Sequence, residues 1–332
     1  MTIFITGARG FVMSVLMHRL LESDIDCRIV AVDITEPDEL LLRSLGNAVE
    51  RVQFRTLDVR DGDAVTAAIK AAAPDVVVHG ATITHVPEWE RANPARFIDV
   101  NVMGTTRVLD AARSTPSVRK VVHVSSAAVY GTGTGDTGPL PEDVPLLPDE
   151  MYGVSKVASE LVARRFSELY DLDVPIVRFT KVFGPMERPS SSRASMSLPF
   201  HLASALVNGR PAALTERTTR AVGDWVSAVD VADALVALCG ETAARSGTYN
   251  LASGSLAGVP ELVDLFGADV VTAAYDKAVV DMDPDLRHGK NACYSIQRAA
   301  DDLGWRPRDL RTQVAEYVAW AHDNPECFPA RA

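Results

Sequence analysis

Three side chains that could act together on an alcohol lie between residues 125 and 156. Tyr152 and Lys156 stand four residues apart in YGVSKVASELVARRFSELY, a segment that is predicted to form a long helix. Both side chains therefore lie on one helix face, roughly one turn apart. A neighbouring ammonium group favours the phenolate, so it lowers the pKa of a tyrosine from about 10. Such a tyrosine can remove an alcohol proton, or return it, while a hydride moves. Ser126 ends the apolar strand VRKVVHVSS and could hydrogen-bond the same oxygen.

A glycine turn near the N-terminus has the context of a dinucleotide-binding site. TGARGFVM follows an apolar strand at residues 2–6 and opens a helix. Gly7 permits the tight turn, and Gly10 lets backbone amides approach a pyrophosphate at the helix N-terminus. Met13 stands where a third glycine is expected, so we expect looser packing of the helix on the sheet, or a shifted helix. Taken alone, the glycines could form a simple turn and the Tyr152–Lys156 pair a contact on a helix surface.

Asp33 ends the second strand, CRIVAVD, 26 residues after Gly7. A carboxylate at this position can accept hydrogen bonds from both ribose hydroxyls, and it repels a 2′-phosphate. The residue could instead cap the following helix. Arg9 argues the other way, because an arginine inside the turn could bind a 2′-phosphate. We give Asp33 more weight, since its charge actively opposes NADP, and we expect NAD.

Strands alternate with helices through the first half of the chain. Short runs of Val and Ile without polar alternation, such as DVVVHGA, predict parallel strands that are covered on both faces. A helix is expected from about residue 94 to 113, and His123 is expected in the core. The fold class is therefore α/β, a doubly wound parallel-sheet Rossmann domain with a smaller, interleaved α/β C-terminal lobe. We expect residues 1–180 plus about 224–251 to bind NAD, and about 181–223 plus 252–332 to form the substrate-binding lobe.

Composition excludes several classes of function. The chain has 332 residues, a formal net charge of -11 and no basic stripe, so a nucleic-acid partner is not expected. Four widely spaced cysteines predict neither a disulfide framework nor a zinc site, and DMDPD at 281–285 lacks the spacing of a metal site. The apolar runs are too short to span a bilayer, and the N-terminus enters a strand directly. We expect a cytoplasmic protein without a membrane partner or a metal.

Taken in order, ten motifs resemble those of the extended short-chain dehydrogenases/reductases, the NAD-dependent epimerase/dehydratase family. The motifs span nearly the whole chain: TGARGF, Asp33, LDVRD, HGAT, NVMGTTRVLDAA, SSAAVYG, YGVSK, VRFTKVFGP, GDWVSAVDVADAL and LGWRP. The resemblance implies that Tyr152, Lys156 and Ser126 are catalytic, and that Lys156 also holds the nicotinamide ribose. It implies a homodimer that pairs through the helix near residue 94 and the helix of Tyr152.

The resemblance also implies a set of cofactor contacts, with Asp58 near the adenine and Ala81 on the nicotinamide side. The expected cofactor-binding residues are Gly7, Arg9, Gly10, Phe11, Asp33, Asp58, Val59, Ala81, Asn101, Tyr152 and Lys156.

Departures from the family pattern bear on the substrate. Family members that eliminate water from nucleotide sugars carry an Asp-Glu pair where this chain has Ala127 and Ala128, so that elimination is not expected. Lys181 and Gly223 replace an asparagine and an arginine that help to hold a substrate diphosphate. Lys181 should face the cleft, where it could meet a carboxylate or a phosphate. Further candidates for anion contacts are Arg188, Arg193, Arg220 and Arg287, although for each of them a solvated surface arginine is the favoured interpretation.

The expected function is NAD-dependent oxidation of a secondary hydroxyl on a sugar or sugar-acid-like substrate. Release of the ketone would make the enzyme a dehydrogenase, and return of the hydride to the other face would make it an epimerase. A nucleotide-sugar 4-epimerase and a non-catalytic NAD-binding sensor are the alternatives. Loops at 131–138 and about 187–195 are expected to cover the site. The expected substrate-binding residues are Thr82, His85, Ser125, Ser126, Lys181, Arg188 and Arg193.

Overall fold

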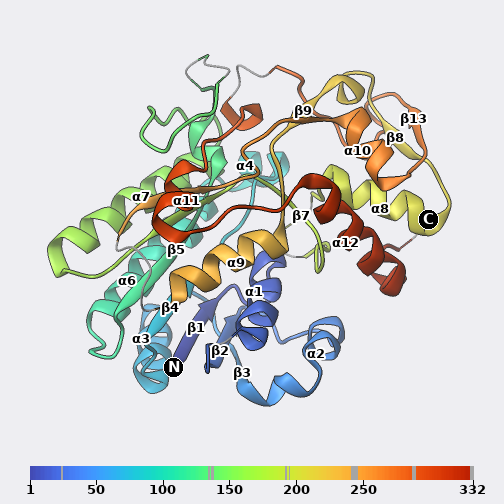
Figure 1. Cartoon of the computed structure of the whole chain (residues 1–332). Helices are drawn as coiled ribbons and strands as arrows, with labels where there is room; N and C mark the ends of the chain where they lie inside the picture. Colours follow the sequence, from blue (N-terminus) through green and yellow to red (C-terminus); the bar gives the residue numbers. More distant parts are fainter. Residues whose placement is uncertain are drawn as a thin grey trace.

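A seven-stranded parallel sheet forms the centre of the molecule in the order β3-β2-β1-β4-β5-β6-β11 (Figure 1). The computed structural model describes residues 1–23, 25–133, 135, 138–190, 193, 195–240, 246–285 and 289–329. The order reverses between β1 and β4, which is where such sheets bind ligands. The strands are β1 (Thr2–Thr6), β2 (Arg28–Asp33), β3 (Val52–Thr56), β4 (Val76–His79), β5 (Lys120–Ser126), β6 (Ile176–Phe179) and β11 (Thr248–Leu251).

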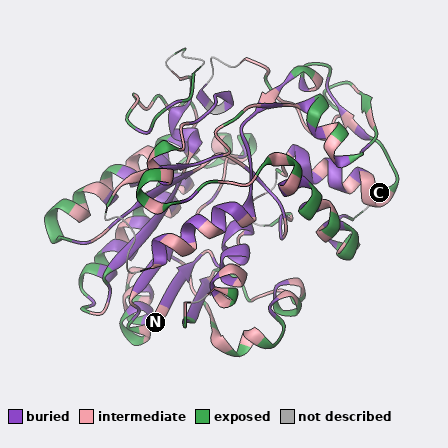
Figure 2. Ribbon diagram, in the orientation of Figure 1, coloured by how far each residue is buried: buried purple, intermediate pink, exposed green. Residues whose placement is uncertain are grey.

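Helices cover both faces of this sheet, which confirms the predicted doubly wound fold. One face packs against α1 (Phe11–Glu22) and α9 (Ala228–Cys239), which lie side by side. The other face packs against α3 (Gly62–Ala72), α6 (Gly104–Arg113) and α7 (Met151–Tyr170). Figure 2 shows the strands buried and the outer sides of these helices exposed. The runs of Val and Ile in the strands follow from this burial, because neither face of the sheet meets water.

A second lobe has its own apolar core. Its helices are α8 (Leu198–Asn208), α10 (Val259–Phe266) and α12 (Leu310–Asp323). Its paired strands are β7 (Lys181–Phe183) with β10 (Trp225–Ser227), β8 (Ala212–Leu214) with β13 (Val270–Thr272), and β9 (Val222–Gly223) with β12 (Ala257–Gly258). The chain enters this lobe after β6, returns to the central sheet through α9 and β11, and then enters the second lobe again.

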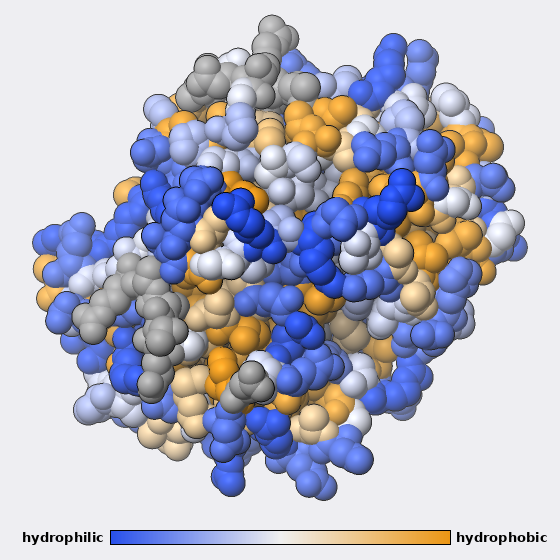
Figure 3. All heavy atoms as spheres, viewed as in Figure 1, coloured by the Kyte–Doolittle hydropathy of each residue, from blue (hydrophilic) through white to orange (hydrophobic). Residues whose placement is uncertain are grey.

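Hydrophilic residues predominate on the face of the molecule seen in Figure 3, with smaller hydrophobic groups between them.

The helix expected at residues 94–113 is divided by a π-helical segment. It begins as α5 (Ala95–Phe97), continues as a π segment (Ile98–Met103) and ends as α6. Such wider turns often occur at functional sites. Shorter helices complete the described fold: α2 (Glu39–Leu45), α4 (Pro87–Ala92) and α11 (Gln297–Leu303).

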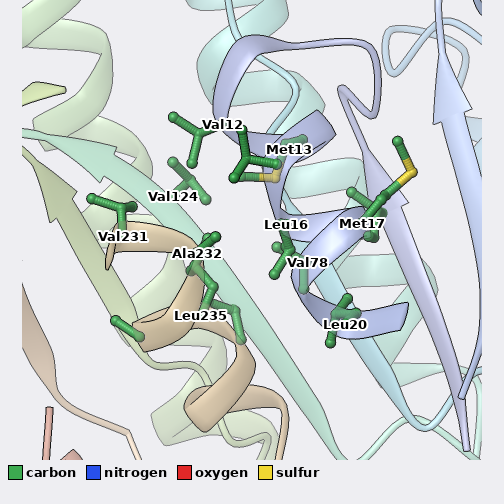
Figure 4. Packing of buried hydrophobic residues seen from close by; sticks show 14 of the residues in the cluster. Val12, Met13, Leu16, Met17, Leu20, Val78, Val124, Val231, Ala232 and Leu235 are labelled. Carbon is green, nitrogen blue, oxygen red and sulfur yellow. The ribbon is translucent and has the colours of Figure 1, made fainter. Parts of the chain in front are cut away.

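Met13 packs closely against the sheet because the residue opposite it is a glycine. A Cβ atom added to Gly80, directly after β4, would lie 2.6 Å from the sulfur of Met13. Met13 is 3% exposed and belongs to the core that includes Leu16 and Val78 (Figure 4). The space that a third glycine would leave on α1 is therefore provided by Gly80 on the sheet. The expectation of looser packing or a shifted helix is replaced by this close fit.

A buried ion pair joins α7 to the sheet. Arg178 on β6 donates from Nε to Oε1 of Glu160, 2.9 Å away, and from Nη2 to Oε2, 2.7 Å away; both side chains are 0% exposed. The Ser125 hydroxyl at the end of β5 donates to Oε1 of Glu160 at 2.6 Å. The second amino group of Arg178 donates to the Tyr130 hydroxyl at 2.9 Å. Glu160 therefore fixes α7 relative to the ends of β5 and β6, where Ser126 and Phe179 lie.

Replacing Gly80 by Ala should destabilise the fold, because the added methyl group would overlap Met13. Overpacking of this kind costs about 1–3 kcal/mol of the free energy of unfolding, measurable by urea denaturation. Gly138→Ala, where a Cβ would meet no atom within 4 Å, is the control. The loss should shrink in a Met13→Ala background. Equal stability of Gly80→Ala and the parent protein would refute this packing.

Replacing Glu160 by Gln should destabilise the fold far more than replacing Ser125 by Ala. The first change leaves the Arg178 guanidinium buried without its counter-charge, at a cost of about 3–5 kcal/mol. The second removes one hydrogen bond, worth about 1 kcal/mol. Glu168→Gln, on the exposed part of α7, is the matched control. Chemical denaturation of the four proteins gives the ranking, and a Glu160→Gln variant as stable as its control would contradict it.

Candidate active site

One cavity of about 490 Å³ opens at the carboxyl ends of the parallel strands, where the strand order reverses. Its wall brings together residues that are far apart in the sequence. These include all the expected substrate-binding residues and, of the expected cofactor-binding residues, Gly7, Arg9, Gly10, Phe11, Asp33, Asp58, Val59, Ala81, Tyr152 and Lys156. Asn101 is 1% exposed and lies behind the wall, where its amide donates to the Ile83 carbonyl and the Ser155 hydroxyl.

The glycine turn leaves room for a dinucleotide at the start of α1. Gly7 has φ +69°, and a Cβ there would lie 2.7 Å from the Ala81 nitrogen. A Cβ on Gly10 would lie 2.8 Å from the Gly7 oxygen. Gly10 is the N-cap of α1, and no side chain caps its amides. These free amides and the positive helix end fit a pyrophosphate.

Two carboxylates lie beside the glycine turn, and that of Asp33 belongs to a residue of the cavity wall. Asp33 accepts a hydrogen bond from the Arg9 backbone nitrogen at 3.0 Å. The Arg9 guanidinium is turned to Thr35 and to Asp38, and Arg188 also pairs with Asp38, at 2.9 Å. Burial would raise the pKa of Asp38, but the Leu41 amide, Arg9 and Arg188 together hold it below its usual value. Asp38 thus neutralises the charge of Arg9, and Asp33 is a second carboxylate next to it. This environment fits NAD better than NADP.

Tyr152, Ser126 and Lys156 meet on the cavity wall. Ser126 lies close enough to the Tyr152 phenol to lower its pKa. Lys156 is 3% exposed, and its Nζ donates to the Val124 carbonyl at 2.9 Å. Nζ lies 5.9 Å from the centre of the Tyr152 ring. The residues expected to act on an alcohol are therefore neighbours on α7 and β5.

The expected effect of Lys156 on the Tyr152 pKa is wrong for this structure. Burial raises the Tyr152 pKa to about 12, the bond from Ser126 lowers it, and the charge of Glu150 raises it further. Burial also lowers the Lys156 pKa to about 7, although Glu160 opposes this shift. The Lys156 ammonium points to the backbone of β5. Burial of Tyr152 and Lys156 therefore shifts their pKa values more than the two side chains shift those of each other.

Two neutral histidines lie behind Lys156. Burial, together with the charge of Lys156, lowers the pKa of His79 to about 3 and that of His123 well below its usual value. Their rings stack with centroids 5.8 Å apart. His123 is 1% exposed and bonds to Ser159, which confirms it as a core residue.

Several candidate substrate contacts already have protein partners. The Ser125 hydroxyl donates to Glu160, and the Thr82 hydroxyl donates to Asn101 at 3.0 Å. Arg193 pairs with Glu187 at 2.5 Å, and its guanidinium lies 5.3 Å from the centre of the Phe11 ring.

Lys181 lies over Gly223, so the two residues that depart from the family pattern are neighbours in the structure. A Cβ on Gly223 would be 2.8 Å from Cδ of Lys181. Nζ of Lys181 donates to Asn291 at 3.2 Å. The glycine therefore makes space for the lysine stem. Arg220 is exposed beside Glu216, while Arg287 lies outside the described residues, as do parts of the two loops expected to cover the site.

Sequence reasoning missed Glu150 and Glu90, which lie close to His85. Nδ1 of His85 is 3.2 Å from Oε2 of Glu150 and 3.4 Å from Oε2 of Glu90. In the sequence, only the position of Glu150, two residues before Tyr152, could have indicated its place near the site.

Within the described residues, no group of three or more His, Cys, Asp or Glu is arranged to hold a metal ion. Nor is any described helix sufficiently long and apolar to cross a membrane.

Comparisons with known proteins agree with this geometry. The profile of the NAD dependent epimerase/dehydratase family matches residues 3–252. A dTDP-glucose 4,6-dehydratase of Streptomyces antibioticus is 32% identical, over 98% of this chain and 93% of that protein. A UDP-glucose 4-epimerase of Mycolicibacterium smegmatis is 31% identical over 96% of each. The solved structure of MoeE5 with UDP-glucuronic acid and NAD has a TM-score of 0.79 and 25% identity, over 98% of this chain and 100% of that one. The chain therefore belongs to the NAD dependent epimerase/dehydratase family.

Proposed function

We propose that this enzyme uses NAD to oxidise a secondary hydroxyl of a sugar or sugar-acid-like substrate, through Tyr152, Ser126 and Lys156. The observation that carries the proposal is the meeting of these side chains with the glycine turn and Asp33 in one cavity. The uncapped start of α1 would hold the pyrophosphate, and Asp33 the adenosine ribose. Bound NAD supplies the hydride acceptor. Ser126 orients the substrate oxygen, and Tyr152 receives the alcohol proton in its phenolate form, which a bound oxidised nicotinamide would favour.

The same side chains serve a dehydrogenase and an epimerase. Hydride return to the opposite face of a ketone held in the cavity would give the epimer, without any additional acid or base. The similarity to a UDP-glucose 4-epimerase supports a nucleotide-sugar 4-epimerase as the second candidate. Elimination of water is not proposed, because Ala127 and Ala128 provide no acid or base.

The substrate is proposed to carry an anionic group that reaches Lys181. The lysine stem fills the space above Gly223, and Lys181 lines the cavity. A carboxylate or a phosphate could each accept from it. The likeness to MoeE5, which was solved with UDP-glucuronic acid, favours a sugar acid among these possibilities.

The two parts of the chain are proposed to divide the work. Residues 1–180 with about 224–251 would bind NAD, because α9 and β11 pack with the central sheet. Residues about 181–223 with 252–332 would bind the substrate, because they build the second core and carry Lys181.

A homodimer that pairs through the π segment and α7 is proposed from exposed apolar side chains. Ile98, Met103, Val154 and Leu161 are 37%, 41%, 39% and 58% exposed. Val154 and Leu161 are two turns apart on one face of α7, and α7 contacts the π segment. Covering this face would remove these side chains from water.

We further propose that the enzyme works in the cytoplasm. All four cysteines are buried free thiols. Thiols persist in the reducing conditions of that compartment.

Replacing Tyr152 by Phe should lower turnover by at least about 10²-fold, because the hydroxyl that exchanges the proton is lost. NAD affinity, measured by calorimetry, should remain close to that of the parent protein. Tyr170→Phe, at the exposed end of the same helix, is the matched control. Undiminished turnover in Tyr152→Phe would remove this residue from the mechanism.

Replacing Leu161 by Glu should convert the dimer to a monomer, because it buries a charge at the proposed interface. Sedimentation velocity measures the change. Val271→Glu, on the exposed side of the second lobe, should leave the mass unchanged. A monomeric parent protein, or a Leu161→Glu variant that remains dimeric, would refute the interface.

A further inference from the structure

Two arginines of the cavity wall share one carboxylate that is not itself part of that wall. Arg9, in the glycine turn, and Arg188, after β7, both line the cavity, whereas Asp38 does not. Oδ2 of Asp38 accepts from Nη2 of Arg9 at 3.0 Å and from Nε of Arg188 at 3.0 Å. Nη2 of Arg188 lies 2.9 Å from the same oxygen. One carboxylate oxygen therefore holds both guanidinium groups in place.

The two arginines depend on Asp38 to different degrees. Arg188 also donates to the Met186 carbonyl at 2.9 Å and to the Arg9 carbonyl at 3.4 Å. Within the described part of the chain, the guanidinium of Arg9 has only Asp38 and the Thr35 hydroxyl as hydrogen-bond partners, and its buried Nε has none. Loss of the Asp38 charge would therefore release Arg9, while Arg188 would keep its two carbonyl partners.

The charges around the glycine turn are balanced. Asp33 and Asp38 supply two negative charges, and Arg9 and Arg188 supply two positive charges. Asp33 also accepts from the Arg9 backbone nitrogen at 3.0 Å, so it lies next to the residue whose guanidinium Asp38 holds. NADP differs from NAD by a phosphate on the adenosine ribose, and a nearby arginine is the usual partner of that phosphate. Exclusion of NADP therefore requires that Arg9 has no free charge to offer.

We propose that Asp38 is a positioning residue for the choice of cofactor, which disfavours NADP by occupying Arg9. The inference goes beyond the proposed function, because it concerns the choice between two cofactors and does not depend on the sugar substrate. Asp33 repels the 2′-phosphate by its charge, whereas Asp38 withholds the arginine that would pair with it. NAD lacks this phosphate, so neither effect weakens its binding.

Replacing Asp38 by Asn tests this role. The Asn side chain can still cap α2, where Oδ1 of Asp38 accepts from the Leu41 nitrogen at 2.9 Å, so the fold should be kept. Calorimetry with NAD and with NADP measures the two affinities of the purified protein. The ratio of NADP affinity to NAD affinity should rise by at least about 10-fold, because Arg9 becomes free to form a charge-assisted hydrogen bond. High salt should reduce this gain.

Two further proteins separate this effect from a change in net charge or in packing. Glu39→Gln removes one negative charge from the next, exposed residue on α2 and should leave the ratio unchanged. Adding Arg9→Gln to the Asp38→Asn variant should return the ratio towards that of the parent protein. A purely structural role of Asp38 would weaken the binding of both cofactors alike and would not move their ratio.

An unchanged ratio in Asp38→Asn would overturn the proposal. An equal rise in Glu39→Gln, or a rise that persists when Arg9 is also replaced, would overturn it as well. A parent protein that binds NADP as tightly as NAD would show that Asp38 excludes nothing. These outcomes depend on binding alone, so they are distinct from a failure to oxidise a sugar hydroxyl, which only a turnover assay detects.

Discussion

The buried pair of Arg178 and Glu160 is the constraint on which the active site depends. It joins β6 to α7, and the Ser125 hydroxyl adds the end of β5 to the same carboxylate. Ser126 follows directly on β5, while Tyr152 and Lys156 lie on α7 before Glu160. A shift of the helix along the sheet would break charged hydrogen bonds that water cannot replace. The positions of Ser126, Tyr152 and Lys156 are therefore fixed by a contact that none of them makes.

The same carboxylate also acts on the chemistry. Burial draws the Lys156 pKa down to about 7, and Glu160 opposes the shift from one turn along the helix. Behind Lys156, His79 and His123 are held neutral by burial and by its charge. Close to Tyr152, Glu150 makes the phenolate still less favourable. The site thus places neutral groups behind the lysine and a negative charge near the tyrosine.

The sequence was sufficient to predict the fold and many of the residues that line the cavity, because these depend on local patterns. Runs of Val and Ile marked the strands, and the glycine turn and the Tyr152–Lys156 spacing marked the site. Contacts between distant residues were not accessible. Gly80 makes room for Met13, and Gly223 for Lys181, and neither pairing leaves a signal in one sequence. The Tyr152 pKa was predicted with the wrong sign, because burial in the folded chain outweighs the helix spacing. Asn101 was expected at the cofactor, but the π segment turns its amide toward Ile83 and Ser155.

Nicotinamide absorbance, followed together with product analysis, distinguishes a sugar-oxidising enzyme from a protein that only binds NAD. The purified protein is incubated with excess NAD and a panel of free sugars, sugar acids and nucleotide sugars. We expect either a stoichiometric build-up of NADH with one substrate class, or interconversion of two epimers without net NADH. The first result would identify a dehydrogenase, and the second an epimerase that recycles its cofactor. Binding of NAD without either reaction, across the whole panel, would contradict the claim that these side chains oxidise a sugar hydroxyl.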